Sequence, residues 1–267
     1  MKAVVTGKNG AGQYISEIAL REPLPKGSYL TGLPAVKHLA SGNALSLRSN
    51  VTFFVGENGT GKSTLTEAIA VAYGFNAEGG SRNFSFATMQ THSELWKYLT
   101  LSRHKYAKDG FFLRAESFYN VASNIDEMDQ EPSFSAPVIQ SYGGVSLHRQ
   151  SHGESFLALV QNRFGGNGLY ILDEPEAALS PTRQLSLMAE IDNLVHKDSQ
   201  FIIATHSPIL MTFPGALIYQ FSADGVEAVT YRDTEHYRLT RRFLENPERM
   251  LGYLFEDFRE GGNEYET

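Results

Sequence analysis

A glycine-rich stretch that ends in lysine and serine is the strongest chemical signal in the sequence. It reads Gly56-Glu-Asn-Gly-Thr-Gly-Lys62-Ser63 and matches the phosphate-binding pattern G-x-x-x-x-G-K-[ST]. Glycines let backbone N–H groups turn towards phosphate oxygens, the lysine neutralises the β- and γ-phosphates, and the serine hydroxyl binds Mg²⁺. The alternative is a glycine-rich turn that caps an ordinary helix. We predict a triphosphate site made by Gly56, Asn58, Gly59, Thr60, Gly61, Lys62, Ser63 and Thr64.

Two adjacent carboxylates, Asp173 and Glu174, follow the apolar run Leu169–Leu172. A carboxylate at the end of a buried strand can bind Mg²⁺, and its neighbour can polarise a water for in-line attack on a γ-phosphate. We therefore predict Ser63 and Asp173 as metal ligands and Glu174 as the catalytic base. The alternative is that Asp-Glu-Pro only forms a cap or a turn. Glu176 either supports this site or is solvated at the turn, and the second interpretation is favoured.

The elements that must position these residues alternate between strands and helices. Apolar runs predict buried strands at 51–55, 111–113, 169–172 and 201–204, and helical spacing predicts helices from Lys62, over 155–164 and from Pro181 to about Lys197. Continuous apolar strands that alternate with helices indicate a parallel sheet covered on both faces. The fold class expected is therefore α/β.

The rest of the chain is expected to be mixed. We predict a helix around 92–107, an exposed acidic loop over 126–137 and a strand pair at 216–221 and 226–231. The tail from Glu235 to Phe258 has helical spacing, with a break near Asn246-Pro247.

Composition narrows the function classes. The chain has 267 residues, no cysteine and a formal net charge of −7, which exclude a disulfide scaffold and disfavour bulk coating of nucleic acid. No apolar run approaches membrane-spanning length, so we expect a soluble, cytoplasmic protein without direct membrane insertion. Two basic clusters leave nucleic-acid contact possible, although solvated helix faces are the favoured interpretation: Arg103, Lys105 and Lys108, and Arg238, Arg241 and Arg242.

The order of the motifs resembles the ABC-type ATPases, in particular their RecF/SMC-like branch of soluble ATPases. Ser151-His-Gly-Glu-Ser155 lies where the LSGGQ-like signature belongs, 22 residues before Asp173. Ala178–Pro181 resembles the D-loop, and Thr205-His206-Ser207 resembles the switch-histidine loop. The alternatives are that Ser151 only caps a helix and that His206 is an ordinary loop histidine.

The resemblance implies a P-loop NTPase fold of the ABC type. It would form one domain over 1–267, mainly a parallel sheet with an antiparallel β portion, a helical or lid insertion at about 76–150 and C-terminal helices at about 235–258. Two copies would enclose two ATP molecules head to tail with Mg²⁺, as a homodimer that depends on ATP. Lys62, Glu174 and His206 would be the catalytic residues, while Ser151 and Gly153 would contact the nucleotide of the second copy.

The chain departs from the family pattern at several positions. His152, Glu154 and Ser180 replace the usual Gly, Gln and Asp, and no glutamine is evident at the lid position, where Glu116 is the candidate. The implied function is that of a soluble ATPase that acts as a switch or motor for an effector protein, in DNA processing or defence. The alternatives are the ATP-binding subunit of a membrane ABC transporter and a regulatory module that binds nucleotide without hydrolysis.

Overall fold

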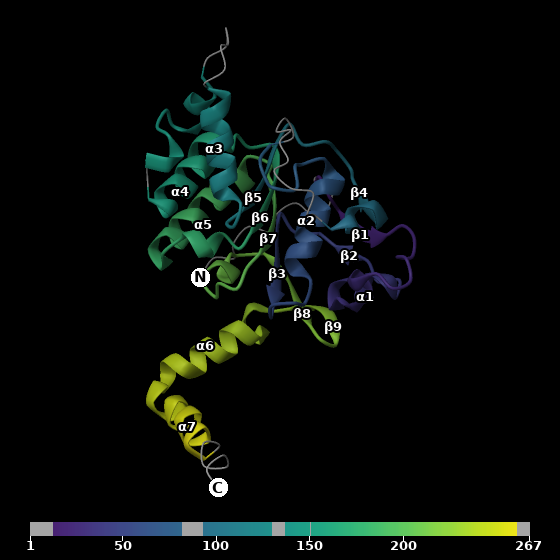
Figure 1. The fold of residues 1–267 in the computed structure, drawn as a ribbon, viewed down its shortest axis with the longest axis vertical. Coiled ribbons are helices and arrows are strands. Elements are labelled where there is room, and N and C mark those ends of the chain that lie inside the picture. The colour runs from purple at the N-terminus through teal and green to yellow at the C-terminus, as the bar shows by residue number, and fades with distance from the viewer. Residues whose placement is uncertain (1–12, 82–92, 130–136, 150, 261–267) are drawn as a thin grey trace.

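The structure is a computed structural model that describes residues 13–81, 93–129, 137–149 and 151–260. Its main sheet has six strands, of which five are parallel and the last is antiparallel to its neighbour (Figure 1). This confirms the predicted α/β class, the mainly parallel sheet and the strand pair that follows it. The strands, in spatial order, are β5 (Asp109–Arg114), β6 (Gly168–Asp173), β7 (Gln200–Ala204), β3 (Val51–Gly56), β8 (Leu217–Ser222) and β9 (Gly225–Val229).

The sheet is buried on both faces because consecutive strand residues point into two different cores. Phe53, Phe111 and Phe201 belong to one core, while their neighbours Phe54 and Phe112 belong to the other. Helices cover both faces (Figure 1). The first core is closed by α3 (Phe118–Met128), α4 (His152–Arg163) and α5 (Pro181–His196), and the second by α1 (Pro34–Ala40) and α2 (Lys62–Tyr73).

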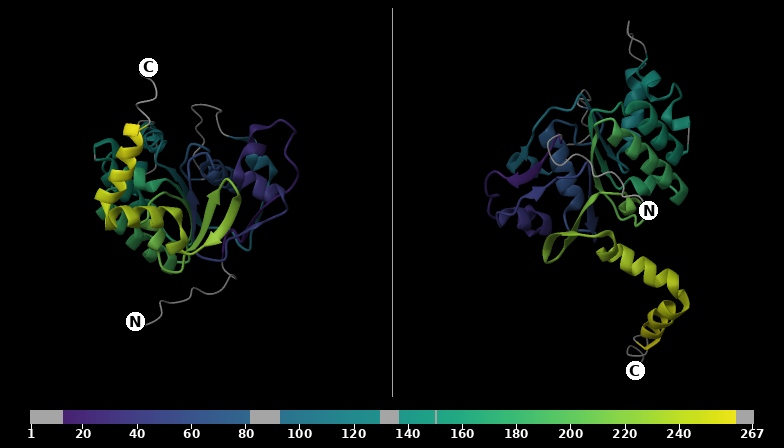
Figure 2. Two further views of the ribbon diagram at one scale, coloured as in Figure 1. Left: turned by 90° about the horizontal axis from the view of Figure 1, so that it is seen from below. Right: turned by 180° about the vertical axis from the view of Figure 1, so that it is seen from behind.

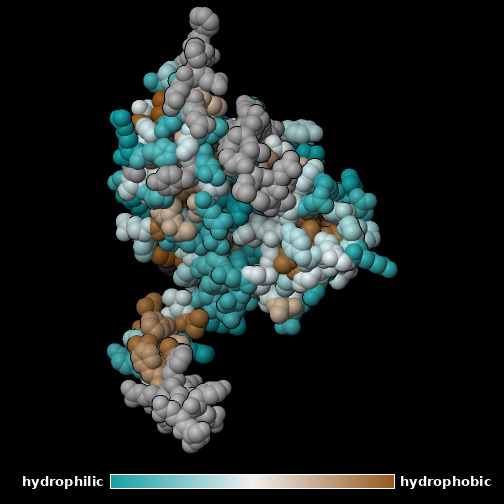
Figure 3. Space-filling view, in the orientation of Figure 1, coloured by the Kyte–Doolittle hydropathy of each residue, from teal (hydrophilic) through white to brown (hydrophobic). Residues whose placement is uncertain are grey.

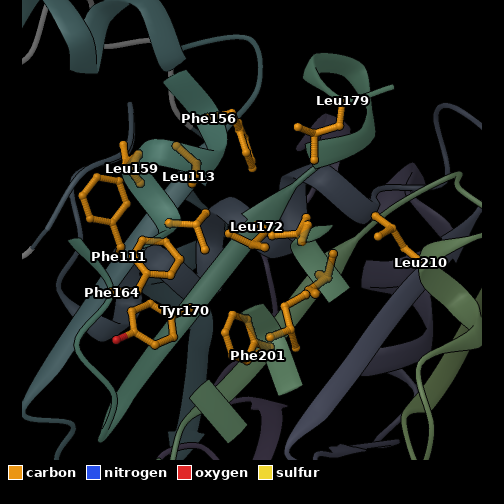
Figure 4. Close-up of a cluster of buried hydrophobic side chains, with 14 of the residues drawn as sticks. Phe111, Leu113, Phe156, Leu159, Phe164, Tyr170, Leu172, Leu179, Phe201 and Leu210 are labelled. Carbon is orange, nitrogen blue, oxygen red and sulfur yellow. The ribbon is translucent and has the colours of Figure 1, made fainter. Parts of the chain in front are cut away.

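Aromatic packing holds β6 in the first core (Figure 4). The rings of Phe164 and Tyr170 stack with centroids 4.2 Å apart and an interplanar angle of 9°. The Tyr170 hydroxyl donates to Asp109 Oδ2 at 2.7 Å, so the polar end of this buried ring is satisfied. These contacts fix the start of β6, and the strand then delivers Asp173 at its other end.

A second, antiparallel sheet was missed by the sequence patterns. It consists of β2 (Leu45–Ser46), β1 (Glu17–Leu20) and β4 (Leu99–Ser102), and the predicted helix over 92–107 is wrong. A short 3₁₀ helix, Glu94–Tyr98, is followed by β4, whose Leu99 and Leu101 pair with Leu20 and Ile18 of β1. The leucines recur every second residue, which suits a strand, and pairing with a distant segment decided the outcome.

The predicted acidic loop is also partly wrong. Helix α3 continues through Asp126 to Met128, and the Asp129 carboxylate accepts hydrogen bonds from the backbone N–H groups of Val138 and Ile139. Here acidic side chains serve as hydrogen-bond acceptors within the fold. Residues 130–136 of the predicted loop lie outside the described residues. The predicted insertion at 76–150 contains β4 and β5 as well as α3.

Two C-terminal helices project from the body of the molecule (Figures 1 and 2). They are α6 (Glu235–Glu245) and α7 (Pro247–Glu260), with the predicted break at Asn246–Pro247. We call residues 235–260 the C-terminal arm. Its apolar side chains gather on the surface (Figure 3). Within 235–255, the exposed large apolar side chains are Leu239, Phe243, Leu244, Tyr253, Leu254 and Phe255. Among the described residues, no helix combines the length and apolar composition needed to cross a bilayer.

Candidate active site

The glycine loop joins the end of β3 to the start of α2, as predicted. Gly56 has φ +137°, and a Cβ at this position would lie 2.0 Å from the Phe221 carbonyl oxygen, so only glycine fits beside β8. Gly59 and Gly61 also have positive φ, +79° and +92°. Helix α2 begins at Lys62, and the first amides of an α-helix have no acceptor within the helix. The loop therefore has a backbone conformation that requires glycine, and the N-terminus of α2 can bind an anion through its free amides.

Lys62 folds back over this loop. Its Nζ donates to the carbonyl oxygens of Gly56 at 2.6 Å and Glu57 at 2.8 Å, and the residue is only 4% exposed. Burial lowers the pKa of Lys62, and the carboxylates of Glu174 and Asp173 oppose this effect. A buried cation thus lies close to the predicted catalytic base Glu174 and the predicted metal ligand Asp173. The exposed loop tip carries Asn58, while Thr60 is buried and donates to Glu57 O at 2.8 Å.

The two predicted metal ligands contact each other. The Ser63 hydroxyl donates to Asp173, whose carboxylate is 5% exposed at the end of β6. Burial raises the pKa of Asp173 to about 6, although the nearby Arg114 guanidinium and the Ser63 hydrogen bond favour the charged form. Arg114 Nε lies 3.3 Å from Asp173 Oδ2, and its NH1 lies 2.9 Å from Glu67 Oε2. Sequence patterns did not point to Arg114, which reaches Asp173 because β5 and β6 pair in parallel with these two residues in register.

These residues fit a magnesium ion. Asp173 Oδ1 is buried and has no hydrogen-bond partner among the described residues. A buried carboxylate oxygen without a partner is unfavourable unless it binds a cation or a donor. Mg²⁺ prefers hard oxygen ligands and is commonly held by one or two protein groups together with phosphate oxygens. Ser63 and Asp173 would therefore be the protein ligands.

The buried charge of Asp173 predicts a pH-dependent stability. The folded pKa of about 6 exceeds the ordinary value near 3.8, so the folded state binds more protons between pH 4 and 6 and loses stability as pH rises through that window. Without nucleotide and magnesium, Asp173→Asn is expected to raise the free energy of unfolding by about 3 kcal/mol at pH 8, with a gain that shrinks towards pH 4.

Urea unfolding between pH 4.5 and 8 measures this effect. Asp192→Asn serves as the control, because that side chain is 62% exposed on α5 and its removal should leave stability nearly unchanged. A pH-independent gain, or a loss of stability at pH 8, would contradict the raised pKa of the buried Asp173 carboxylate.

Glu174 has an unusual backbone conformation beside the predicted switch histidine. Its φ of +51° and ψ of +50° lie in the left-handed region, which non-glycine residues seldom adopt. Its N–H donates to Ala204 O at 2.9 Å, and Glu174 Oε1 lies 3.6 Å from His206 Nε2. Strained backbone of this kind often occurs at functional sites, where the surrounding structure fixes it. The structure brings Glu174 and His206 together at the ends of neighbouring parallel strands.

The expectation that Glu176 is solvated is wrong. Its carboxylate accepts hydrogen bonds from His206 N at 2.5 Å and Thr205 Oγ1 at 2.7 Å, and burial raises its pKa. Ser207 Oγ donates to Gln184 Oε1 at 2.5 Å on α5. Glu176 thus fixes the loop that carries His206. The sequence did contain a signal for this role. Glu176 follows the end of β6, and its donors Thr205 and His206 follow the end of the neighbouring strand β7.

The predicted signature segment forms the start of α4. Ser151 is the N-cap residue; its N–H and hydroxyl donate to Glu154 Oε2 at 3.1 and 2.7 Å, and Arg183 donates to Ser151 Oγ at 3.1 Å. Gly153 is buried, and a Cβ there would lie 3.0 Å from Ala178 O. These contacts lie within the first turn of α4 and with α5 and the turn after β6, as the helix-cap interpretation expects. A role towards a second copy stays a prediction.

The remaining predicted positions lie nearby but make fewer contacts. Ser180 stands at the N-cap of α5 without a capping hydrogen bond from its side chain, and Thr64 is half-buried in the first turn of α2. The lid candidate Glu116 has an 81% exposed side chain whose Oε2 lies 3.3 Å from Arg114 NH2.

The basic cluster on α6 forms ion pairs with neighbouring carboxylates. Arg238 pairs with Asp233 at 2.9 Å and Arg241 with Glu245 at 2.7 Å, as expected of solvated helix faces.

Two family models match separate parts of the chain. Residues 38–117 match a family described as "AAA domain", and residues 145–212 match one described as "AAA domain, putative AbiEii toxin, Type IV TA system". A curated relative, "Retron Vc95 probable ATPase" from Vibrio cholerae serotype O1 biovar El Tor, is 28% identical over 114 residues. That match covers 36% of this chain and 22% of the relative, so it spans less than a quarter of the relative's length.

The solved structures similar to this chain include an SMC head domain and a component of an ABC transporter complex. The SMC head domain from Thermotoga maritima has a TM-score of 0.42 at 17% identity, covering 82% of this chain and 99% of that chain. CbiO1 from Clostridium perfringens, part of the ABC transporter complex cbiONQ, has a TM-score of 0.46 at 16% identity, covering 91% of this chain and 99% of that chain. Both likenesses are distant. The AAA-domain match over 38–117 contains the glycine loop, and the match over 145–212 contains Asp173, Glu174 and His206.

Proposed function

We propose that this chain binds Mg·ATP, dimerises around it and hydrolyses it as a switch or motor for an effector protein. One observation carries the proposal: the carboxyl ends of β3, β6 and β7 bring the P-loop, the two carboxylates and the histidine to one place. The charges of Glu174 and Asp173 act on the pKa of Lys62, and the Ser63 hydroxyl donates to Asp173. Glu174 Oε1 lies 3.6 Å from His206 Nε2. Ligands of open parallel sheets bind at this edge.

Binding of ATP would use groups that already point at the site. The triphosphate would lie on the backbone amides between β3 and α2, where Lys62 can exchange the carbonyl oxygens of Gly56 and Glu57 for phosphate oxygens. Ser63 and Asp173 would hold Mg²⁺, which when bound neutralises charge on the β- and γ-phosphate oxygens. The Arg114 guanidinium would limit the repulsion between Asp173 and the incoming anion.

Hydrolysis would depend on Glu174 and His206. Glu174 would accept a proton from a water whose oxygen attacks the γ-phosphorus, while the bond from that phosphorus to the bridging oxygen breaks and ADP leaves. His206 would donate a hydrogen bond from Nε2 to a γ-phosphate oxygen. Glu176 supports this geometry because it holds the His206 N–H and the Thr205 hydroxyl.

The dimer would complete each site with α4 of a second copy. Ser151 and His152 are exposed at the N-terminus of this 12-residue helix, and the positive end of a helix favours a phosphate. A mixing experiment tests this arrangement. Lys62→Ala should inactivate the site in the same chain, whereas Ser151→Arg should inactivate only the site in the other chain.

Each variant alone is expected to be inactive, and an equimolar mixture should recover roughly a quarter of the wild-type phosphate release. Half of the dimers would then be mixed, and each would have one intact site of two. Ser186→Arg, on an exposed position of α5, is the matched control that should retain activity by itself. A mixture as inactive as its components, with both variants folded by circular dichroism, would contradict a shared site.

The comparisons favour one class of effector. One matched family is described with an AbiEii toxin of a type IV toxin–antitoxin system, and the curated relative is the ATPase of a retron. These descriptions support a toxin or retron partner over a membrane transporter. Capture of a toxin or retron protein by Glu174→Gln with ATP in native cells would support this choice, and capture of a membrane permease would reverse it.

A further inference from the structure

A second histidine contacts the switch histidine from the root of the C-terminal arm. His206 Nδ1 lies 3.0 Å from His236 Nε2, and the two rings meet edge to face with centroids 5.1 Å apart. His236 is the second residue of α6, and β8 and β9 separate it from His206 along the chain. We propose that His236 is a positioning residue that holds His206 in the tautomer with its proton on Nε2. This inference rests on the proposed role of His206.

The hydrogen bond between two neutral imidazoles allows two proton arrangements. A neutral imidazole has one N–H and one lone pair, so either His236 Nε2 donates to His206 Nδ1 or the reverse. In the first arrangement His206 carries its proton on Nε2, which faces Glu174 Oε1 at 3.6 Å. In the second, the lone pair of His206 Nε2 would face that carboxylate, which is repulsive.

The far side of His236 favours the same arrangement. Its Nδ1 is buried and has no hydrogen-bond partner among the described residues. If His236 donates through Nε2, this buried atom is a lone pair; if it accepts, the buried atom is an N–H donor. Buried N–H groups without an acceptor are rarer than under-satisfied acceptors. His206 Nε2 is likewise buried without a hydrogen-bond partner among the described residues, and the Glu174 carboxylate 3.6 Å away favours an N–H over a lone pair at that atom. The electrostatics at His206 and the burial at His236 Nδ1 thus favour the tautomer in which His206 can donate to a phosphate.

The pair is neutral near pH 7. Burial lowers the pKa of both histidines, and the Lys62 cation acts in the same direction. The carboxylates of Glu174 and Glu57 oppose this effect at His206, and those of Glu57 and Glu235 oppose it at His236. A neutral pair has one shared proton in the contact, which is the condition for a defined tautomer.

The first turn of α6 is anchored, so His236 is held in place. Thr234 is fully buried and caps the helix by accepting from Tyr237 N at 3.3 Å. Glu235 N donates to Gln220 Oε1 on β8 at 3.0 Å. Beyond this turn the arm leaves the body (Figure 2). A displacement of α6 at its root would therefore move the partner of His206, which connects the arm to the nucleotide site.

The test combines kinetics with the tautomer of His206. His236→Ala is expected to lower kcat for phosphate release about 10-fold with a change in KM of less than about two-fold. His236→Gln is expected to restore most of kcat, because its amide N–H can donate in place of Nε2. His196→Ala, at an exposed position on α5, is the control that should match the wild type.

Nitrogen-15 NMR of the imidazoles in the nucleotide-free protein reads the tautomer directly. The wild type is expected to show His206 with its proton on Nε2, and His236→Ala to show a mixture of tautomers. An unchanged tautomer in His236→Ala, or an unchanged kcat beside an active wild type, would overturn the proposal. Because the NMR measurement needs no turnover, a failure of the proposed ATPase function would be seen separately.

Discussion

Glu174→Gln is expected to lower phosphate release at least about 100-fold while ATP affinity stays within about three-fold of the wild type. Glutamine has nearly the shape of glutamate but cannot accept the proton of an attacking water. The backbone of residue 174 is held by its N–H bond to Ala204 O, so the substitution should leave the strand end in place. Phosphate release and a calorimetric ATP titration measure the two quantities side by side.

The same variant is expected to accumulate as a dimer when ATP is added, because closure is retained and release is blocked. Light scattering checks the mass with and without ATP. Glu227→Gln, an exposed position on β9, is the control and should behave as the wild type. Equal, near-background phosphate release in wild type and Glu174→Gln would favour a module that binds ATP without hydrolysis.

Lys62→Ala is expected to weaken ATP binding by about 100-fold. The lysine is the buried cation of the site, and charge-assisted hydrogen bonds to phosphate are among the strongest that side chains make. Its loss would also leave Asp173 and Glu174 without their shared counter-charge, which adds repulsion towards an incoming triphosphate. Calorimetric titration with ATP, with and without Mg²⁺, measures the loss.

Lys37→Ala provides the matched control, because Lys37 is an exposed lysine on α1. Its ATP affinity should equal that of the wild type. If Lys62→Ala bound ATP as tightly as Lys37→Ala, the assignment of residues 56–63 as a phosphate-binding loop would be wrong.

The sequence predicted those parts of the site that depend on local pattern. The glycine loop can be recognised because its backbone conformation requires glycine at fixed positions. At Gly56, for example, a Cβ would collide with the Phe221 carbonyl oxygen. The strands of the main sheet were predictable because burial on both faces leaves continuous apolar runs, such as Leu169–Leu172. Asp173 and Glu174 could be placed because they follow a buried strand of a parallel sheet, whereas His206 was expected from the resemblance of residues 205–207 to a switch-histidine loop.

Residues that act through distant contacts could not be predicted in this way. Arg114 reaches Asp173 only through the register of β5 and β6. His236 contacts His206 although β8 and β9 separate the two residues along the chain. Strand β4 was read as part of a helix because Leu95 and Leu99 are four residues apart, whereas Leu99 and Leu101 alternate as a strand and pair with β1. Glu176 looked like a turn residue because its donors lie on the next parallel strand end.

The central claim is that a triphosphate lies on the amides after β3, with Lys62 and Asp173 sharing it and its magnesium. A crystal structure of Glu174→Gln with Mg·ATP tests this most directly. We expect the β- and γ-phosphates against the backbone of residues 57–63, Lys62 Nζ on their oxygens, and the metal between Ser63 Oγ and Asp173. A nucleotide bound elsewhere, or phosphates that contact neither Lys62 nor a Ser63-bound metal, would contradict the account.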